Sequence, residues 1–330
     1  MNARKDSTDR FTQWTAAGVS ILNGAFGDYL VRRNNALAID MAFMHRGQAL
    51  LLERDALRAA YPTSDGRLCI FLHGLCCNEA SWQFPDEGNI AGQTYGSLLQ
   101  DEIGITPLFV RYNTGLPIAE NGRRLAGVLN ALLAAFPVPI REIVLIGHSM
   151  GGLVARSACD AARSEASATG LGCTWLPLLA KMFYLGTPHE GADLEKLAHA
   201  TTAVLDAVPN RITRLIGEIL GLRSEGIKDL RAGLGAVEPG AATGLRDDAQ
   251  SIRHYLVAGT LADDPAHPVS RLLGDGLVRM PEPAGFAEDG QPGAQRVQIG
   301  IFPGVHHMAL AHDMNVYRQI RDWMTDKADT

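Results

Sequence analysis

The chain has 330 residues, of which 46% are hydrophobic and 20% charged, and its formal net charge is −6. This composition is typical of a globular protein and excludes a chain that stays disordered for lack of apolar residues. A pI of about 5.9 without clustered lysine and arginine gives no electrostatic footprint for DNA or RNA, so nucleic acid is not an expected partner.

Targeting and redox signals concern where the protein works. Residues 1–10 are polar and charged, and no uncharged apolar run reaches the length of a membrane span, so we expect neither a signal peptide nor a span. The five cysteines are an odd number without metal-ligand spacing, which favours a reducing compartment. The expected location is cytoplasmic.

The first part of the chain predicts a helix and a hairpin. Apolar residues from Thr15 to Arg33 recur at intervals of three and four, as on one face of a helix. We take residues 1–36 as an N-terminal helical extension and residues 37–330 as one α/β domain. Residues 39–52 alternate between apolar and polar around a turn at 45–48, which predicts a β-hairpin.

Beyond residue 66, short apolar runs alternate with helical patterns. We expect strands at 68–72, 105–111, 140–146, 178–185, 252–259 and 295–302, and helices at 118–136, 150–163 and 313–325. This alternation predicts a mostly parallel sheet flanked by helices, with the nearly continuous apolar run 140–146 at its centre. Helical periodicity between about 190 and 250 predicts a helical lid or cap inserted between two strands.

The strongest motif is Gly147-His148-Ser149-Met150-Gly151, placed between the most apolar strand and a helix. This G-x-S-x-G pattern is typical of a nucleophile elbow, in which serine occupies a sharp strand-to-helix turn and small neighbours avoid collisions. The adjoining helix N-terminus adds a positive dipole end near developing negative charge. We therefore predict that Ser149 is a nucleophile; the alternative is an incidental serine in a glycine-rich turn.

A second motif, His73-Gly74-Leu75, follows the first parallel strand. In this architecture the loop after that strand supplies one backbone N–H to an oxyanion hole, and the residue after the nucleophile supplies the other. We assign these two N–H groups to Leu75 and Met150. His73 is expected to be a hydrogen-bonded loop residue and not a catalytic one.

A serine nucleophile needs a base to take its proton. The base is expected in the loop before the last helix, where His307 is our choice and His306 the fallback. His312 precedes Asp313, which we expect to cap the terminal helix. These histidines lack partner ligands at metal-site spacing, so no metal is expected.

An acidic residue must orient the base. Asp275 is favoured because it lies between two glycines in a tight loop, whereas Asp263 and Asp264 precede a proline in what is typical of a solvated turn. The predicted role of Asp275 is to hold the imidazole tautomer of the base and to stabilise its imidazolium form.

Together the motifs resemble those of α/β-hydrolase lipases and esterases, particularly the GPI inositol-deacylase (PGAP1-like) group. The resemblance covers about residues 66–325 and rests on HGL (73–75), GHSMGGLVAR (147–156), LGTPHEGADL (185–194), GDGLV (274–278) and GVHHMAL (304–310). It implies an α/β-hydrolase fold and a Ser149, Asp275 and His307 triad. It also implies that His189 lies in a loop at the mouth of the site.

A tentative acyl pocket comprises Leu75, Cys76, Trp82 and His189, although core packing or a structural hydrogen bond explains each of them alone. The predicted function is a serine carboxylester hydrolase, an esterase or lipase, that acts on a small-molecule or lipid ester with an apolar acyl group and needs no cofactor. An acyltransferase or a thioesterase would use the same triad. A noncatalytic binding protein on a hydrolase scaffold is the alternative from another class.

Overall fold

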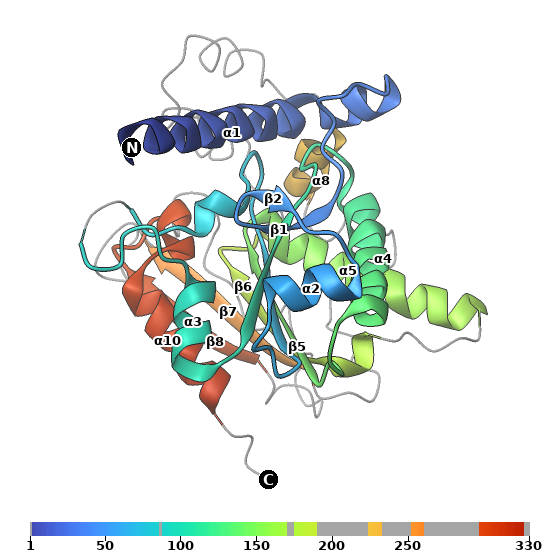
Figure 1. The fold of residues 1–330 in the computed structure, drawn as a ribbon. Coiled ribbons are helices and arrows are strands. Elements are labelled where there is room, and N and C mark those ends of the chain that lie inside the picture. The colour runs from blue at the N-terminus through green and yellow to red at the C-terminus, as the bar shows by residue number, and fades with distance from the viewer. Residues whose placement is uncertain are drawn as a thin grey trace.

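The computed structural model describes residues 2–85, 88–169, 175–189, 224–232, 252–260 and 297–326. Among these residues, strands form one sheet in the order β2-β1-β4-β3-β5-β6-β7-β8 (Figure 1). Their bounds are β1 Ala42–His45, β2 Gln48–Ala49, β3 Arg67–Leu72, β4 Thr106–Arg111, β5 Glu142–His148, β6 Leu179–Leu185, β7 Arg253–Thr260 and β8 Val297–Pro303.

Most of the sheet is parallel. β1 pairs antiparallel with β2 and with β4, whereas the neighbours from β4 to β8 pair in parallel. The central position expected for the apolar run 140–146 is occupied by β5, which lies between β3 and β6. The structure thus has the mostly parallel sheet that the alternation of strands and helices predicts.

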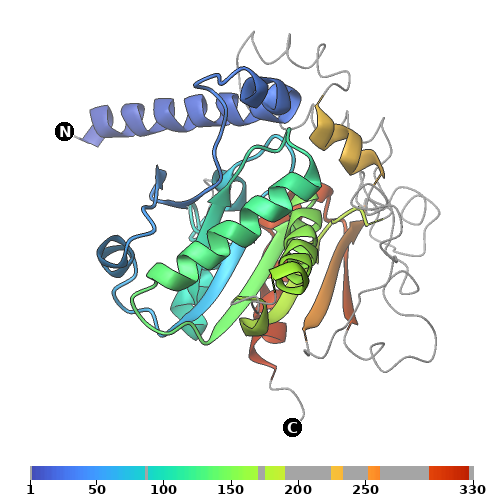
Figure 2. The ribbon, with the colours of Figure 1, turned by 90° about the vertical axis from the view of Figure 1, so that its right-hand side faces the viewer.

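Helices cover both faces of this sheet. Their bounds are α1 Asn2–Arg32, α2 Arg54–Ala60, η1 Glu79–Trp82, α3 Tyr95–Ile103, α4 Ile118–Ala135, α5 Met150–Thr169, η2 Leu176–Leu178, α8 Glu225–Ala232, η6 His307–Ala311 and α10 Met314–Thr325. Figure 2 shows α4 and α5 over one face, with α10 behind the sheet. Of the helical insertion expected at about 190–250, the structure describes residues 224–232, which include α8, and the rest lies outside the described residues.

Alternation along the strands produces a core on each face. Ile70 of β3 and Leu145 of β5 belong to the cluster that includes α4 and α5, whereas Phe71 and Ile146 belong to the cluster that includes α3 and α10. Successive side chains of a strand point to opposite faces, so an inner strand covered on both sides must be apolar throughout. This requirement explains the continuous apolar run that marks β5 in the sequence.

The hairpin is shorter than the pattern 39–52 suggests. β1 and β2 are joined by Arg46 and Gly47, which have φ angles of 50° and 77°. Positive φ at both central residues matches the twist of the flanking strands, which is why two-residue hairpin loops favour it. The turn therefore lies where the sequence places it, at 45–48.

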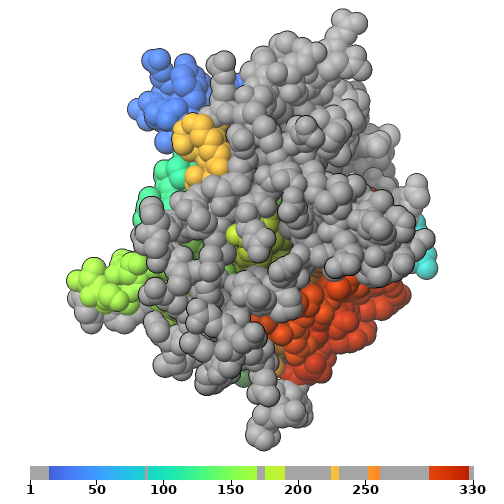
Figure 3. All heavy atoms as spheres, turned by 180° about the vertical axis from the view of Figure 1, so that it is seen from behind, coloured from blue at the N-terminus to red at the C-terminus, as the bar shows by residue number. Residues whose placement is uncertain are grey.

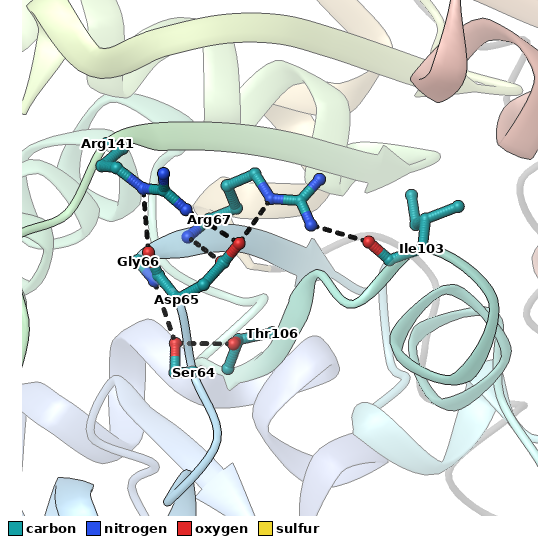
Figure 4. A network of polar contacts seen from close by, with 7 residues as sticks. All are labelled: Ser64, Asp65, Gly66, Arg67, Ile103, Thr106 and Arg141. Atoms are coloured by element: carbon teal, nitrogen blue, oxygen red, sulfur yellow. Dashed lines mark hydrogen bonds and ion pairs between the residues drawn. The ribbon is translucent and has the colours of Figure 1, made fainter.

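A polar network closes the edge of the sheet at the amino ends of β3 and β5 (Figure 4). The Asp65 carboxylate accepts hydrogen bonds from Arg67 Nε at 2.9 Å and Arg141 Nη2 at 2.8 Å. Arg67 also donates to the Ile103 carbonyl at 2.7 Å. Ligands of parallel α/β sheets bind at the opposite, carboxyl edge, where the loops after β3, β4, β5 and β6 gather.

α1 crosses that carboxyl edge (Figure 1). The α1 side chains of Ile21 and Ala25 are buried. The Asn23 side chain donates to the Leu37 carbonyl at 2.7 Å and accepts from the Ile39 N–H at 2.9 Å, which ties the helix to the segment leading into β1. Among the helices that the structure describes, none combines the length and the apolar character needed to cross a membrane.

Two glycines of α4 allow a test of how α4 packs against α5. A Cβ at Gly122 would lie 2.7 Å from the backbone carbon of Ser157 in α5, whereas a Cβ at Gly127 would meet nothing within 4 Å. We expect Gly122→Ala to lower the free energy of unfolding by about 1–3 kcal/mol through overpacking, and Gly127→Ala to raise it by about 0.5–1 kcal/mol through helix propensity. Urea unfolding of both variants checks this, and equal effects would contradict the packing described.

Candidate active site

Ser149 is the single residue between the end of β5 at His148 and the start of α5 at Met150. Its φ is 52°, in the left-handed region that residues with a Cβ rarely occupy. Two backbone hydrogen bonds hold it there: Ser149 N–H donates to the Leu185 carbonyl at 2.8 Å, and Gly152 N–H donates to the Ser149 carbonyl at 3.1 Å. Such strain clusters at functional sites.

The glycines around Ser149 are required by close backbone approach. A Cβ at Gly147 would collide with the backbone of Gly151 and Gly152. A Cβ at Gly151 would collide with the carbonyl oxygen of Leu72, at the end of β3. The G-x-S-x-G spacing therefore allows the strand, the turn and the helix to pack in contact, as the sequence pattern indicates.

The loop after β3 lies against this turn. A Cβ added at Gly74 would be 3.1 Å from Ser149 Cβ, so the loop and the serine are neighbours. Within the described part of the chain, the N–H groups of Leu75 and Met150 donate to no acceptor. Backbone N–H groups beside a nucleophile can stabilise negative charge that develops on a substrate oxygen.

His73 has a structural environment. Its Nδ1 donates to the Gly74 carbonyl at 2.9 Å, its Nε2 accepts from the Tyr112 N–H at 3.4 Å, and its ring stacks on Tyr112 with centroids 4.4 Å apart. This arrangement requires the neutral imidazole, and burial lowers the pKa of His73 to about 4. The hydrogen-bonded loop role expected for His73 agrees with these contacts.

The two candidate bases, His306 and His307, differ in burial and in contacts. His306 is exposed and its ring accepts a hydrogen bond from the Ala309 N–H at 3.4 Å, so it caps η6. His307 is 5% exposed, and its ring centroid lies 4.9 Å from that of His148. The His307 carbonyl accepts a hydrogen bond from His148 Nε2 at 3.0 Å, which joins η6 to the nucleophile turn.

The expected helix cap is described by the structure, whereas the candidate acids are not. Asp313 caps α10, as expected, because its carboxylate accepts from the N–H groups of Asn315 and Val316 at 2.8 and 3.1 Å. His312 directly precedes this cap. Asp263, Asp264 and Asp275 lie outside the described residues, so the acid stays a prediction.

The tentative pocket residues occupy different surroundings. Trp82 is fully buried, with its ring edge-on to Phe71 at 5.1 Å and to His148 at 6.3 Å, so it supports the nucleophile turn from within the core. The Cys76 thiol lies against Gly24 of α1. His189 packs edge-on to Tyr184 at 4.8 Å, and burial lowers its pKa.

Sequence reasoning missed two residues that hold the loop after β3. The Tyr112 hydroxyl donates to the His73 carbonyl at 2.7 Å, and Thr114 Oγ1 accepts from the Cys76 N–H at 3.1 Å. Their signal is the run Tyr112-Asn113-Thr114-Gly115 at the carboxyl end of a strand. Polar residues there lie at the edge of the sheet where sites form.

The pKa of His73 predicts how stability depends on pH. An exposed imidazole has a pKa of 6.5, so the unfolded chain takes up a proton below that pH, whereas folded His73 stays neutral until about pH 4. The unfolded state binds more protons in this window, and the free energy of unfolding falls as the pH falls. His73 alone contributes a loss of about 2 kcal/mol at pH 5 relative to pH 8.

Urea unfolding of wild type and His73→Asn between pH 8 and pH 5 measures this contribution. The variant should lose less stability on acidification, whatever its stability at pH 8. A ring NMR titration of His73 with a midpoint near 6.5 would contradict the neutral, buried imidazole.

The sequence model of the Alpha/beta hydrolase family matches residues 69–318. None of the curated proteins compared with the chain matches it. Similar solved structures include the mature lipase BlEst2 of Bacillus licheniformis, with 17% identity, a TM-score of 0.47 and coverage of 79% of this chain and 93% of the lipase.

Two further structures are similar at the same level. A malate-bound thermophilic esterase from Thermogutta terrifontis has 17% identity and a TM-score of 0.39 and covers 79% of this chain and 90% of its own. Phospholipase PlaB from Legionella pneumophila has 14% identity and a TM-score of 0.49, with coverage of 80% and 60%. The family match over residues 69–318 confirms the expected α/β-hydrolase fold. The chain belongs to the alpha/beta hydrolase family.

Proposed function

We propose that the chain is a serine carboxylester hydrolase. The observation that carries the proposal is Ser149 in a left-handed conformation at the turn between β5 and α5, flanked by the Gly74–Leu75 loop. In a nucleophile elbow, a serine held in this way presents its hydroxyl at the carboxyl edge of the sheet, and the expected oxyanion donors are the backbone N–H groups of the next residue and of the loop after a neighbouring strand. This arrangement favours acyl transfer over a purely structural turn.

The reaction would proceed in two halves. Ser149 Oγ attacks the ester carbonyl carbon while His307 takes the hydroxyl proton, and the N–H groups of Leu75 and Met150 stabilise the oxyanion. His307 returns the proton to the leaving alcohol, which leaves an acyl group on Ser149. Water, deprotonated by His307, then attacks this acyl-enzyme and releases the acid. Asp275 would orient the imidazole throughout.

The proposed substrate is an ester with an apolar acyl group, such as a lipid. The motif resemblance to the GPI inositol-deacylase group of lipases supports this class, together with the apolar periodicity of residues 190–250. The cytoplasmic location expected from the cysteines is part of the same proposal.

Removal of the nucleophile tests the proposal directly. We expect Ser149→Ala to lower kcat on p-nitrophenyl esters by at least about 10³-fold, because alanine has no hydroxyl that could form the acyl-enzyme. Ser167→Ala, at an exposed position of the same helix, is the matched control and should retain wild-type rates. Esters and thioesters of rising acyl length define the preferred bond and chain. Equal hydrolysis by wild type and Ser149→Ala would exclude Ser149 as the nucleophile.

Adjacent histidines allow a paired test of the base. Buried His307 should be essential, so we expect His307→Ala to lower kcat by about 10³-fold or more. Exposed His306→Ala removes only a helix cap and should keep activity within about threefold, with a stability loss of about 1 kcal/mol. Steady-state kinetics and thermal unfolding measure both effects. The reverse order of activity would move the base to His306.

A further inference from the structure

The oxyanion loop, defined here as residues 73–77, is attached at two points to the turn between β4 and α4. Thr114 Oγ1 accepts the Cys76 N–H at 3.1 Å, and the Tyr112 hydroxyl donates to the His73 carbonyl at 2.7 Å. Tyr112 and Thr114 are each 1% exposed, so these bonds form away from water. A buried hydrogen bond of this kind is costly to lose, because the partner left behind stays unsatisfied.

Cys76 needs such an anchor because its φ is 61°. A side-chain-bearing residue keeps a left-handed conformation only where its surroundings hold it. The bond to Thr114 fixes the peptide that joins Leu75 to Cys76, and the bond to Tyr112 fixes the peptide that follows His73. The Leu75 N–H belongs to the peptide between these two fixed points. Inside the loop, the Gly74 carbonyl of that peptide accepts hydrogen bonds from His73 Nδ1 at 2.9 Å and from the Cys77 N–H at 3.2 Å. The bonds to Tyr112 and Thr114 fix the peptides on either side of it from outside the loop.

The turn that carries Thr114 is itself held by two segments distant in sequence. From α1, the Gly27 carbonyl accepts a hydrogen bond from Asn113 Nδ2 at 3.2 Å. From α8, the Gly226 N–H donates to the Gly115 carbonyl at 3.1 Å, and a Cβ at Gly226 would collide with the Thr114 carbonyl. The turn is therefore hydrogen-bonded to both helices.

The two helices are also joined to each other. Ser224, just before α8, donates to the Gly24 carbonyl of α1 at 2.7 Å, and α8 adjoins α1 on the surface in Figure 3. Asp229 of α8 accepts from the Ile118 N–H at 2.8 Å, which caps α4 directly after the turn. Thr114 thus connects the oxyanion loop to a turn that is hydrogen-bonded to α1 and α8, and α8 also caps the start of α4.

We propose that Thr114 is a positioning residue, which acts through Cys76 to aim the Leu75 N–H at the oxyanion of the transition state. The inference rests on the proposed ester hydrolysis. Its chemical consequence is specific: loss of the Thr114 acceptor weakens stabilisation of the tetrahedral state more than it weakens substrate binding.

The decisive comparison is Thr114→Val, which keeps the shape but removes the acceptor, against Thr114→Ser, which keeps the acceptor. We expect Thr114→Val to lower kcat by about 10- to 100-fold with KM changed by less than about threefold, since a misaimed donor costs less than a deleted one. Thr114→Ser should recover kcat to within about threefold of wild type. Affinity for a trifluoromethyl ketone, which forms a tetrahedral adduct with serine, should fall in parallel with kcat/KM.

Thr106→Val is the matched control, because Thr106 is 2% exposed at the opposite end of β4 and bonds Ser64 through its hydroxyl at 2.7 Å. It should lose stability but keep kcat. If Thr114→Val does not fold, Thr114→Ala removes the same acceptor and takes its place.

An unchanged kcat in the folded Thr114 variant would overturn the inference while leaving ester hydrolysis intact. An equal loss in Thr106→Val, or no recovery in Thr114→Ser, would also overturn it, because the effect would then come from stability alone. A wild-type protein that hydrolyses no ester and forms no ketone adduct would overturn the proposed function, and this inference with it.

Discussion

The left-handed backbone at Ser149 is the constraint on which the rest of the site depends. It turns the chain from β5 directly into α5, and this requires Gly147 and Gly151 to pack against backbone without a Cβ between. Strain of this kind costs on the order of 1–3 kcal/mol and persists only where burial and pairing fix the surroundings. Here the apolar core on both faces of β5 supplies that fixation.

Parallel pairing brings the other parts of the site to the same place. Leu72 of β3 pairs with Gly147 of β5, so the loop that begins at His73 starts beside the nucleophile turn. Leu185 pairs with His148 and accepts the Ser149 N–H, which places the next loop on the other side. The register of three strands thus determines which loops meet, before any side chain of the site is considered.

Residues far apart in sequence then fix the details. α1 and α8 hold the turn after β4, and that turn holds the oxyanion loop through hydrogen bonds. η6 is joined to the nucleophile turn through His148 and the His307 carbonyl. These hydrogen bonds hold the oxyanion loop and η6 next to the turn that carries Ser149.

The strands of the sheet and the glycine-flanked turn at Ser149 were predictable from the sequence. Each expected strand from 68–72 to 295–302 overlaps an observed one. Burial imposes an apolar run on the inner strands, whereas β8, at the edge of the sheet, has no buried residue and shows alternating apolar positions instead. The elbow was predictable because glycine spacing reflects backbone contact. β5 begins at Glu142 and not at 140, since the N–H groups of Arg141 and Glu142 bond the Gly66 carbonyl in the polar edge.

Long-range hydrogen bonds and the burial of individual side chains leave no periodic pattern in the sequence. The Thr114 bond to Cys76 joins residues 38 positions apart, and only the folded register brings them together. His306 and His307 are adjacent and chemically identical, so burial alone distinguishes them, and burial depends on how η6 packs. The placement of Asp275 in a glycine-flanked loop remains a prediction from pattern.

The central claim is that Ser149 forms a covalent bond during the reaction. Peptide mapping by mass spectrometry after treatment with an alkyl fluorophosphonate tests it most directly. We expect one stoichiometric adduct, on the peptide that contains Ser149, with loss of esterase activity in proportion to labelling. An adduct on another residue, or full labelling without loss of activity, would contradict it.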